Sequence, residues 1–297
     1  MLNTLNLCVY KIIQSIEGVI PMKRPVFLVL ALMLAMSLVF SAPAEGTRIG
    51  TLTCIGMTED DVKQWTSDIA AAEGKETPDV NDNTIIFYDN LQAMLLALNS
   101  GEIDRISIGS LAARYIAERN EGLVFAGRQH NTVLGYSIAM LEENSAWIEE
   151  IDSAIADMKD DGTIDALRAR YIDELGASDP EAVELPVIEG ADTIRIAVTG
   201  DLPPMDVILA DGMPAGFNTA FLAELSERVG MNFELVSVES SARAVALSSG
   251  TVDALFWTRG TYDQDGNALP YPLDRMEGTV VSAPYLLDSR DAVSREE

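Results

Sequence analysis

Apolar and polar positions along this chain follow two spacings, one typical of strands and one typical of helices. Short apolar runs such as 194–198 alternate with longer segments in which apolar residues recur every three or four positions. The expected strands are 48–54, 84–88, 106–108, 123–126, 135–140, 194–198, 232–238 and 254–257, and the expected helices are 59–73, 91–100, 111–119, 146–159, 164–175, 219–229 and 242–249. This alternation predicts an α/β protein whose mostly parallel sheets are flanked by helices.

One eight-residue pattern occurs twice, as ALNSGEID at 97–104 and as ALSSGTVD at 246–253. Each copy closes a helical apolar run, passes a glycine and leads into an apolar strand, which is the corner of an α/β unit. The copies are much further apart than the ~20 to 50 residues of a solenoid repeat. The pattern therefore predicts two similar lobes that face each other across a cleft.

The N-terminal region has the pattern of a secretory signal peptide. Lys23 and Arg24 precede an apolar run at 26–40, and small residues follow at 42–44. We therefore expect translation to start at Met22 and the product to be periplasmic or extracellular. The alternative is an uncleaved anchor, because ~18 apolar residues are just enough to span a bilayer.

The remaining chain divides by pattern. An acidic segment with two prolines and no helical period, at 177–193, is typical of a linker. The expected parts are 1–44 as upstream extension and signal peptide, 45–132 as lobe two, 133–176 as the closing part of lobe one, 177–193 as linker, and 194–297 as the opening part of lobe one with the exit to the hinge.

The chain is strongly acidic, with a net charge of −27 at pH 7. Loss of residues 1–44 would leave −29, because three basic residues and one acidic residue lie there. Such a charge disfavours nucleic acid or an anionic membrane surface as a partner, and a solvated acidic surface is its simplest explanation. After loss of residues 1–44 the chain keeps one cysteine, Cys54, and one histidine, His130. Neither an internal disulfide nor a Cys/His metal cluster is therefore expected.

Several stretches resemble the periplasmic solute-binding proteins of polar amino-acid ABC transporters. IRIAVTGDLPPM at 194–205, DGMPAGFN at 211–218, the second repeat copy and SAPY at 282–285 are similar to the opening lobe of that family. RIGTLTCIGMT at 48–58, YSIAM at 136–140 and MKDDGTI at 158–164 are similar to its later half. The resemblance implies the two-lobed periplasmic-binding-protein-like fold, with a ligand cleft between the lobes.

The two halves of the resemblance stand in inverted order along the chain. A circular permutation would give this order, with the old termini joined by the linker and new termini opened at a hinge crossing. The linker of 17 residues at 177–193 reaches at most ~55 to 60 Å, which exceeds the width of one lobe. The alternative is a truncated tandem of two proteins with an incomplete cleft.

The resemblance also implies a set of ligand contacts. In the family an arginine about ten residues ahead of the P-Y segment holds a ligand carboxylate, and Arg275 stands at that distance from Tyr285. A surface arginine in a loop is the alternative for Arg275, and a core tryptophan that ends a strand is the alternative for Trp257. The expected ligand-binding residues are Met57, Thr58, Asp201, Trp257, Thr258 and Arg275.

Three positions depart from the family pattern. Gly109 stands where the family has an acid for the α-ammonium of the ligand, and Leu202 and Met205 stand where the family has aromatic residues. Amino-acid specificity is therefore not implied. We expect a small polar, carboxylated solute.

The sequence favours binding over catalysis, because it contains neither a nucleophile elbow nor a phosphate loop. The expected function is capture of a solute for an ABC permease by a monomer that needs no cofactor or metal. The alternatives are an extracytoplasmic sensor or interaction module with a degenerate cleft, and a lyase on the same fold.

Overall fold

The computed structural model describes residues 46–75, 82–176, 178–263 and 265–296, without the side chains of residues 126–132. The predicted signal peptide, the predicted start at Met22 and the side chain of His130 lie outside this description. Within the described residues, no helix combines the length and the apolar character that a bilayer crossing requires.

Strands and helices alternate along the first part of the chain and again after residue 193. The elements are β1 (Arg48–Leu52), α3 (Glu59–Ala72), β2 (Thr84–Tyr88), α4 (Leu91–Ser100), β3 (Arg105–Gly109), α5 (Ser110–Arg119), β4 (Leu123–Leu141), η1 (Glu142–Asn144), α6 (Ser145–Asp160), α7 (Thr163–Arg168), η2 (Ala169–Asp173), β5 (Thr193–Val198), β6 (Asp201–Leu202), β7 (Asp206–Ile208), β8 (Pro214–Ala215), α8 (Phe217–Val229), β9 (Asn232–Ser237), η3 (Ser240–Ala242), α9 (Arg243–Ser248), β10 (Ala254–Tyr262), β11 (Thr279–Val281) and β12 (Leu286–Arg295). The predicted α/β class is confirmed.

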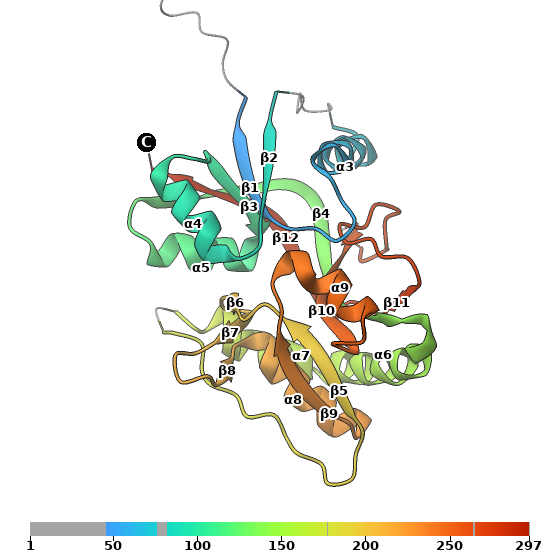
Figure 1. Ribbon diagram of the computed structural model, residues 1–297. Coiled ribbons are helices and arrows are strands. Elements are labelled where there is room, and N and C mark those ends of the chain that lie inside the picture. Colours follow the sequence, from blue (N-terminus) through green and yellow to red (C-terminus); the bar gives the residue numbers. More distant parts are fainter. Residues whose placement is uncertain (1–45, 76–81, 177, 264, 297) are drawn as a thin grey trace, which may run out of the picture. The chain divides into compact units, whose positions relative to one another are not determined.

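The main sheet has the strand order β2-β1-β3-β12-β4-β10-β5-β9, and β11 pairs with β4 (Figure 1). Strands β2, β1 and β3 are parallel neighbours, as are β10, β5 and β9. Strands β12 and β4 lie between these groups and pair antiparallel with their neighbours. Below, the β1 half means β1, β2 and β3 with α3 and α4, and the β5 half means β5, β9 and β10 with α8 and α9.

The repeated sequence pattern forms the same corner in both halves. Gly101 ends α4 with a φ of +79°, a left-handed conformation that suits glycine. The aspartate that ends each copy then binds an arginine in the first strand of its half. Arg48 Nη2 lies 2.6 Å from Asp104 Oδ1, and Arg195 Nη2 lies 2.7 Å from Asp253 Oδ1. The repeat thus joins a helix end to a strand start through a bidentate pair.

The structure differs from the predicted elements mainly in the middle of the sheet. The two strands expected at 123–126 and 135–140 form one long strand, β4, so His130 lies in a strand rather than a loop. No strand was predicted after residue 257, whereas β10 extends to Tyr262 and β11 and β12 follow. The polar residues of β12 break the apolar pattern that marks a strand, yet Asp288, Ser289 and Asp291 are buried.

Helices agree more closely with the predictions. The predicted break at Asp161-Gly162 is present, because α6 ends at Asp160 and Gly162 has a φ of +80°. The expected helix at 164–175 is α7 followed by the π-helical turn η2. In the segment expected to be a linker, Val183 N donates to Pro214 O at 2.9 Å, which holds this segment against β8 of the small sheet β6-β7-β8.

An aromatic stack forms part of the core of the β5 half. Tyr285 lies 4.5 Å from Phe221 and 4.9 Å from Phe256 between ring centroids, and Phe217 stacks on Phe221 at 6.5 Å. All four side chains are buried. This stack supports the strand that carries Phe256 and, next to it, Trp257.

Candidate functional site

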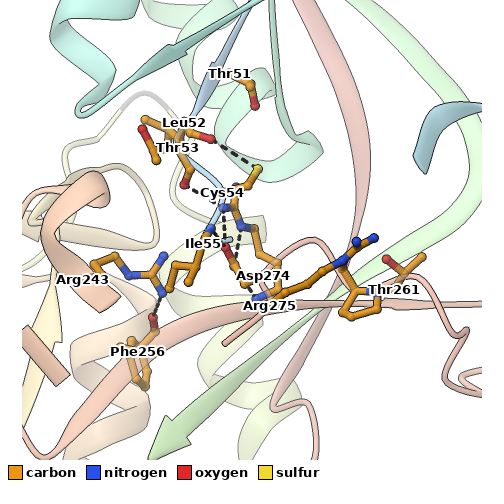
Figure 2. A network of polar contacts seen from close by, with 12 residues as sticks. Thr51, Leu52, Thr53, Cys54, Ile55, Arg243, Phe256, Thr261, Asp274 and Arg275 are labelled. Atoms are coloured by element: carbon orange, nitrogen blue, oxygen red, sulfur yellow. Dashed lines mark hydrogen bonds and ion pairs between the residues drawn. The ribbon is translucent and has the colours of Figure 1, made fainter. Parts of the chain in front are cut away.

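Asp274 binds backbone and side-chain groups from both halves of the sheet. Its Oδ1 accepts from Ile55 N at 2.8 Å and from Arg259 Nη2 at 2.9 Å, and its Oδ2 accepts from Arg259 N and Nε at 2.8 Å each. Ile55 follows β1, whereas Arg259 lies in β10. Figure 2 shows Asp274 beside Ile55 and Cys54 at the end of β1. One carboxylate therefore connects the carboxyl ends of strands from the two halves.

The ion pair between Arg259 and Asp274 is buried, with side chains 7% and 1% exposed. Burial alone would raise the pKa of Asp274, but the Arg259 guanidinium outweighs burial and holds that pKa below its ordinary value. Arg259 Nη2 also donates to Thr53 O at 2.9 Å. The pair is thus held by hydrogen bonds in addition to its charges.

Two further guanidinium groups are buried close to this pair. Arg243, the first residue of α9, donates from Nη2 to Phe256 O at 2.8 Å. Arg290, in β12, donates to Ser107 Oγ at 2.7 Å and to Thr51 Oγ1 at 3.3 Å. Burial lowers the pKa of both arginines, and the charge of Arg259 lowers it further. Three arginines therefore gather where the strands of both halves end.

Trp257 lies between two of these arginines. The Cζ atom of Arg243 lies 4.6 Å from the centroid of its ring and that of Arg259 lies 5.3 Å away, which is the geometry of cation–π contacts. Trp257 has a φ of +42°, uncommon for a bulky residue, at a register shift in the pairing of β10 with β4. Such a backbone costs about 1–3 kcal/mol and is typical of functional sites.

The space between the halves at this centre is small. A cavity of about 20 Å³ is lined by Thr51, Ser107, Trp257, Arg259 and Arg290, among others. A water molecule needs roughly 10–15 Å³, so the cavity has room for about one water molecule and is too small for a solute in this arrangement. A larger, open pocket of about 600 Å³ is lined by Asp274, among others.

Two of the residues expected to bind ligand line the open pocket. Thr258 and Arg275 do so together with Ile55 and Gly56, and Arg275 is exposed. The Thr258 hydroxyl is buried and has no hydrogen-bond partner. Trp257 lines the small cavity instead. These three predicted residues therefore line two different pockets, Thr258 and Arg275 the open one and Trp257 the small cavity.

The other three predicted residues are found in local structural roles. Asp201 accepts a hydrogen bond from Leu91 N at 2.6 Å, at the first residue of α4, and burial raises its pKa. Thr58 is the N-cap of α3 and forms a capping box with Asp61. Met57 packs in the core cluster that contains Trp65. Asp201, Thr58 and Met57 line neither the small cavity nor the open pocket.

Gly109 leaves room for a carboxylate that comes from another strand. A Cβ atom at this position would collide with Asp288 Oδ2 and with the Tyr136 hydroxyl. Asp288 also accepts from Ser110 Oγ at 2.7 Å and from Leu111 N at 3.3 Å, at the start of α5. The acid that the resemblance implied at position 109 is absent, but the space beside Gly109 contains the carboxylate of Asp288.

The sequence around this centre matches a known family. Residues 194–263 match the family model of bacterial extracellular solute-binding proteins, family 3. The match confirms the resemblance for the stretches of the β5 half that precede residue 264, and it includes Arg243, Trp257 and Arg259. The resemblance noted at 48–58, 136–140 and 158–164 lies outside the matched residues. The matched family consists of binding proteins, in agreement with the expected lack of enzymatic activity.

Comparison with curated protein sequences finds no significant match. Several solved structures have partial similarity to this chain. One is the ligand-binding component of an ABC-type import system from Staphylococcus aureus, with zinc bound. It has 10% identity and a TM-score of 0.35, over 84% of this chain and 66% of that one. An ancestral arginine-binding protein bound to arginine has 13% identity and a TM-score of 0.36, over 85% of each chain. A periplasmic substrate-binding protein of an ABC transporter from Coxiella burnetii has 14% identity and a TM-score of 0.39, over 84% of this chain and 85% of that one.

Most residues of this polar centre were not predicted from the sequence, namely Arg243, Arg259, Asp274, Asp288 and Arg290. Asp274 directly precedes Arg275, and Arg259 directly follows Thr258, so their signal in the sequence is their position next to a residue expected to bind ligand. Among the described residues, no group of three or more His, Cys, Asp or Glu side chains is placed to hold a metal ion.

Asp288 makes a testable contribution to the pH dependence of stability. Burial raises the pKa of Asp288 from 3.8 to about 6, although the hydrogen bond from Ser110 acts in the opposite direction. Between about pH 4 and 6 the folded state therefore binds a proton that the unfolded state has released. This carboxyl therefore favours the folded state most at low pH, and its effect is lost as the pH rises through about 6. The change amounts to at most about 3 kcal/mol.

The Asp288→Asn variant should lack this pH-dependent contribution to the free energy of unfolding. The difference in free energy of unfolding between the variant and the wild type, measured by urea denaturation from pH 4 to 7.5, should shift in favour of the variant as the pH rises. Asp192→Asn, at an exposed position, provides the control and should give a flat difference. A flat difference for Asp288→Asn as well would contradict the raised pKa.

Proposed function

We propose that this protein is an extracytoplasmic solute-binding protein that captures a small polar, carboxylated solute and delivers it to an ABC permease. The family match at residues 194–263 supports binding as the activity. The observation that carries the proposal is the set of buried guanidinium groups between the strand ends of the two halves. Guanidinium groups bind carboxylates in bidentate fashion, and ligands of open α/β sheets bind beyond the carboxyl ends of the strands.

A solute needs an arrangement in which the two halves lie further apart. The cavity of about 20 Å³ has no room for one, and three direct contacts close the space. These are the bonds from Ile55 N to Asp274, from Arg259 to Thr53 O and from Arg275 N to Ile55 O. Hinge motion about strands shared by both halves, here β4 and β12, is a known means of opening such a site. The six residues expected from the resemblance remain part of the proposal in that open arrangement.

A thermal-shift screen tests the proposed function. The purified protein, residues 45–297, is heated with amino acids, mono- and dicarboxylates, polyamines and osmolytes in separate wells. A solute present at 100 times its Kd should stabilise the folded state by about 2.7 kcal/mol, provided that it binds only that state. Arg275→Ala should weaken the binding of a carboxylate, and Arg228→Ala, outside both pockets, should not. If no solute raises the melting temperature, transport is excluded as the function.

One observation favours a second candidate, a sensor or interaction module that keeps a closed cleft. Asp274 and Arg259 fill the centre between the halves with groups of the protein itself. In this case no solute would raise the melting temperature, and the protein would be recovered with a membrane receptor rather than with a permease. The solute screen therefore separates the two candidates.

We also propose that the chain order is a circular permutation with the parts 1–44, 45–132, 133–176, 177–193 and 194–297. Two observations support this order. The two halves have equivalent strand orders, β2-β1-β3 and β9-β5-β10. Strand β12, which comes last in the sequence, lies in the sheet between β3 and β4, which come early in the sequence. A reordered gene that begins at residue 193 and joins 296 to 46 through a short linker should give a folded protein with the same circular dichroism spectrum and solute binding. An unfolded product would count against this part of the proposal.

The proposal includes the location of the protein outside the cytoplasm and its oligomeric state. Export is inferred from the N-terminal sequence, and the protein is proposed to act as a monomer. N-terminal sequencing of the exported product should find a residue close to position 45, whereas an uncleaved anchor would leave the protein in the membrane fraction with its full N-terminus. Sedimentation analysis should give the mass of one chain.

A further inference from the structure

The buried centre carries more positive than negative charge. Arg243, Arg259 and Arg290 have 1%, 6% and 9% of their surface exposed. Of these three arginines, only Arg259 forms an ion pair within the described part of the chain, with Asp274. Arg243 and Arg290 bind a carbonyl and two hydroxyl groups instead. The charge of Asp274 also acts on Arg243, but the hydrogen bonds of that carboxylate go to Arg259 and to Ile55 N. A buried guanidinium without a counter-ion is costly, so two groups of this kind in a protein with a net charge of −27 require an explanation.

Arg243 has donors that nothing in the described structure uses. Its Nε and Nη1 atoms are buried and have no hydrogen-bond partner, and the same is true of Nε1 of Trp257, whose ring it contacts. Buried polar atoms are nearly always paired, so each exception needs an explanation. Three unused donors on two touching side chains are suited to the oxygen atoms of an anion.

The side chain of Arg290 donates hydrogen bonds to two hydroxyl groups, and its Cζ atom lies 5.3 Å from the centroid of the Trp65 ring. Arg290 lines the small cavity between the halves together with Arg259 and Trp257. The groups that act on the pKa of Arg290, beyond burial, are Cys54, Arg259 and Tyr136, and none of them is a carboxylate. Arg259 contacts the Trp257 ring, as Arg243 does, and it lines the cavity beside Arg290, so it lies between Arg243 and Arg290 in this chain of contacts.

We propose that the bound solute is a small dianion, whose two negative charges are neutralised by Arg243 and Arg290 while Arg259 keeps Asp274 as its partner. This inference rests on the proposed function and specifies the chemistry of the solute. One carboxylate would leave one guanidinium uncompensated, and an amino group would add a further positive charge to the centre. Two negative charges on oxygen atoms, carried by the two carboxylates of a short dicarboxylate or by one phosphate group, match both the charge and the unused donors.

Titration calorimetry with residues 45–297 tests the charge of the solute. The probes are malonate, succinate and inorganic phosphate as dianions, acetate as a monoanion, glycine and glutamine as zwitterions, and putrescine as a cation. The dianions should bind at least about tenfold more tightly than acetate, because one more charge pair is formed in a buried site. The dicarboxylates and phosphate are separate arms, so their order shows which oxyanion source fits.

Two variants test the assigned residues. Arg243→Met and Arg290→Met should each weaken the binding of the preferred dianion by about 30-fold or more, because each leaves one charge of the solute buried and unpaired. Both variants should keep or raise the melting temperature of the protein without solute, because each removes a buried charge that lacks a counter-ion. A purely structural arginine would show the opposite, a lower melting temperature. Arg195→Met, in the exposed pair with Asp253, serves as a control and should not change the affinity.

The outcomes distinguish this inference from the proposed function. Binding of glycine, glutamine or putrescine in preference to every dianion would overturn the dianion assignment and leave solute binding intact. Unchanged dianion affinity in both methionine variants would also overturn it. No binding by any probe would overturn the assignment together with the proposed function.

Discussion

Replacement of Asp274 by alanine is expected to lower the free energy of unfolding by about 3–5 kcal/mol, the largest effect of a single polar substitution in this protein. The change leaves the Arg259 guanidinium buried without its counter-ion, and it removes the acceptor for the backbone N–H groups of Ile55 and Arg259. A buried, uncompensated charge costs far more than the net contribution of the pair itself. Urea denaturation of the variant and the wild type measures the difference.

Asp253→Ala is the matched control for this prediction. Asp253 forms the same bidentate contact with Arg195, but the two side chains are 22% and 40% exposed, so the loss should be about 1 kcal/mol or less. The double variant Arg259→Met with Asp274→Leu should recover most of the stability, because neither charge is then buried. Equal losses for Asp253→Ala and Asp274→Ala would show that burial does not decide the effect.

Replacement of Tyr285 by alanine should cost a similar amount, about 3–5 kcal/mol, through the cavity that it creates. The ring is 1% exposed and stacks on Phe221 and Phe256. Loss of the ring removes these contacts and leaves space that the rigid strand β10 fills only in part. The same variant should weaken solute binding, because Phe256 directly precedes Trp257 in the proposed site.

Tyr285→Phe separates the ring from its hydroxyl. This variant keeps the stack and should change the free energy of unfolding by about 1 kcal/mol or less, because the buried hydroxyl has no hydrogen-bond partner among the described residues. Calorimetric melting of the three proteins, each with and without the preferred solute, gives both stability and binding. A loss for Tyr285→Phe as large as that for Tyr285→Ala would place the effect in the hydroxyl and contradict the packing argument.

The fold class was predictable because its signals are local. Strand β5 at Thr193–Val198 is a short apolar run, and a glycine follows the end of α4 and of α9 within two residues, after an apolar helical period. These signals depend on residues close together in sequence or on one face of one element. The repeated octet marks the same corner in both halves, although its aspartate binds the first arginine of each half over 56 and 58 positions.

The polar centre was not predictable in the same way. Asp274 lies in a segment without regular structure, and its partner Ile55 is 219 positions away in the sequence. Arg290 lies in a strand whose polar residues gave no strand pattern. No local period shows that such residues are buried, because their burial depends on neighbours from β1, β3 and β10.

The sequence by itself determined that this protein has two similar α/β halves, where most of their elements begin and end, and that one segment resembles a family of binding proteins. Only the tertiary structure decided which side chains meet between the halves, that the central space is reduced to about 20 Å³, and that two buried arginines there have no carboxylate partner among the described residues. The physical reason is the range of the interactions. Hydrophobic period and turn chemistry act over a few residues, whereas buried charges interact with whatever distant strands the fold brings beside them.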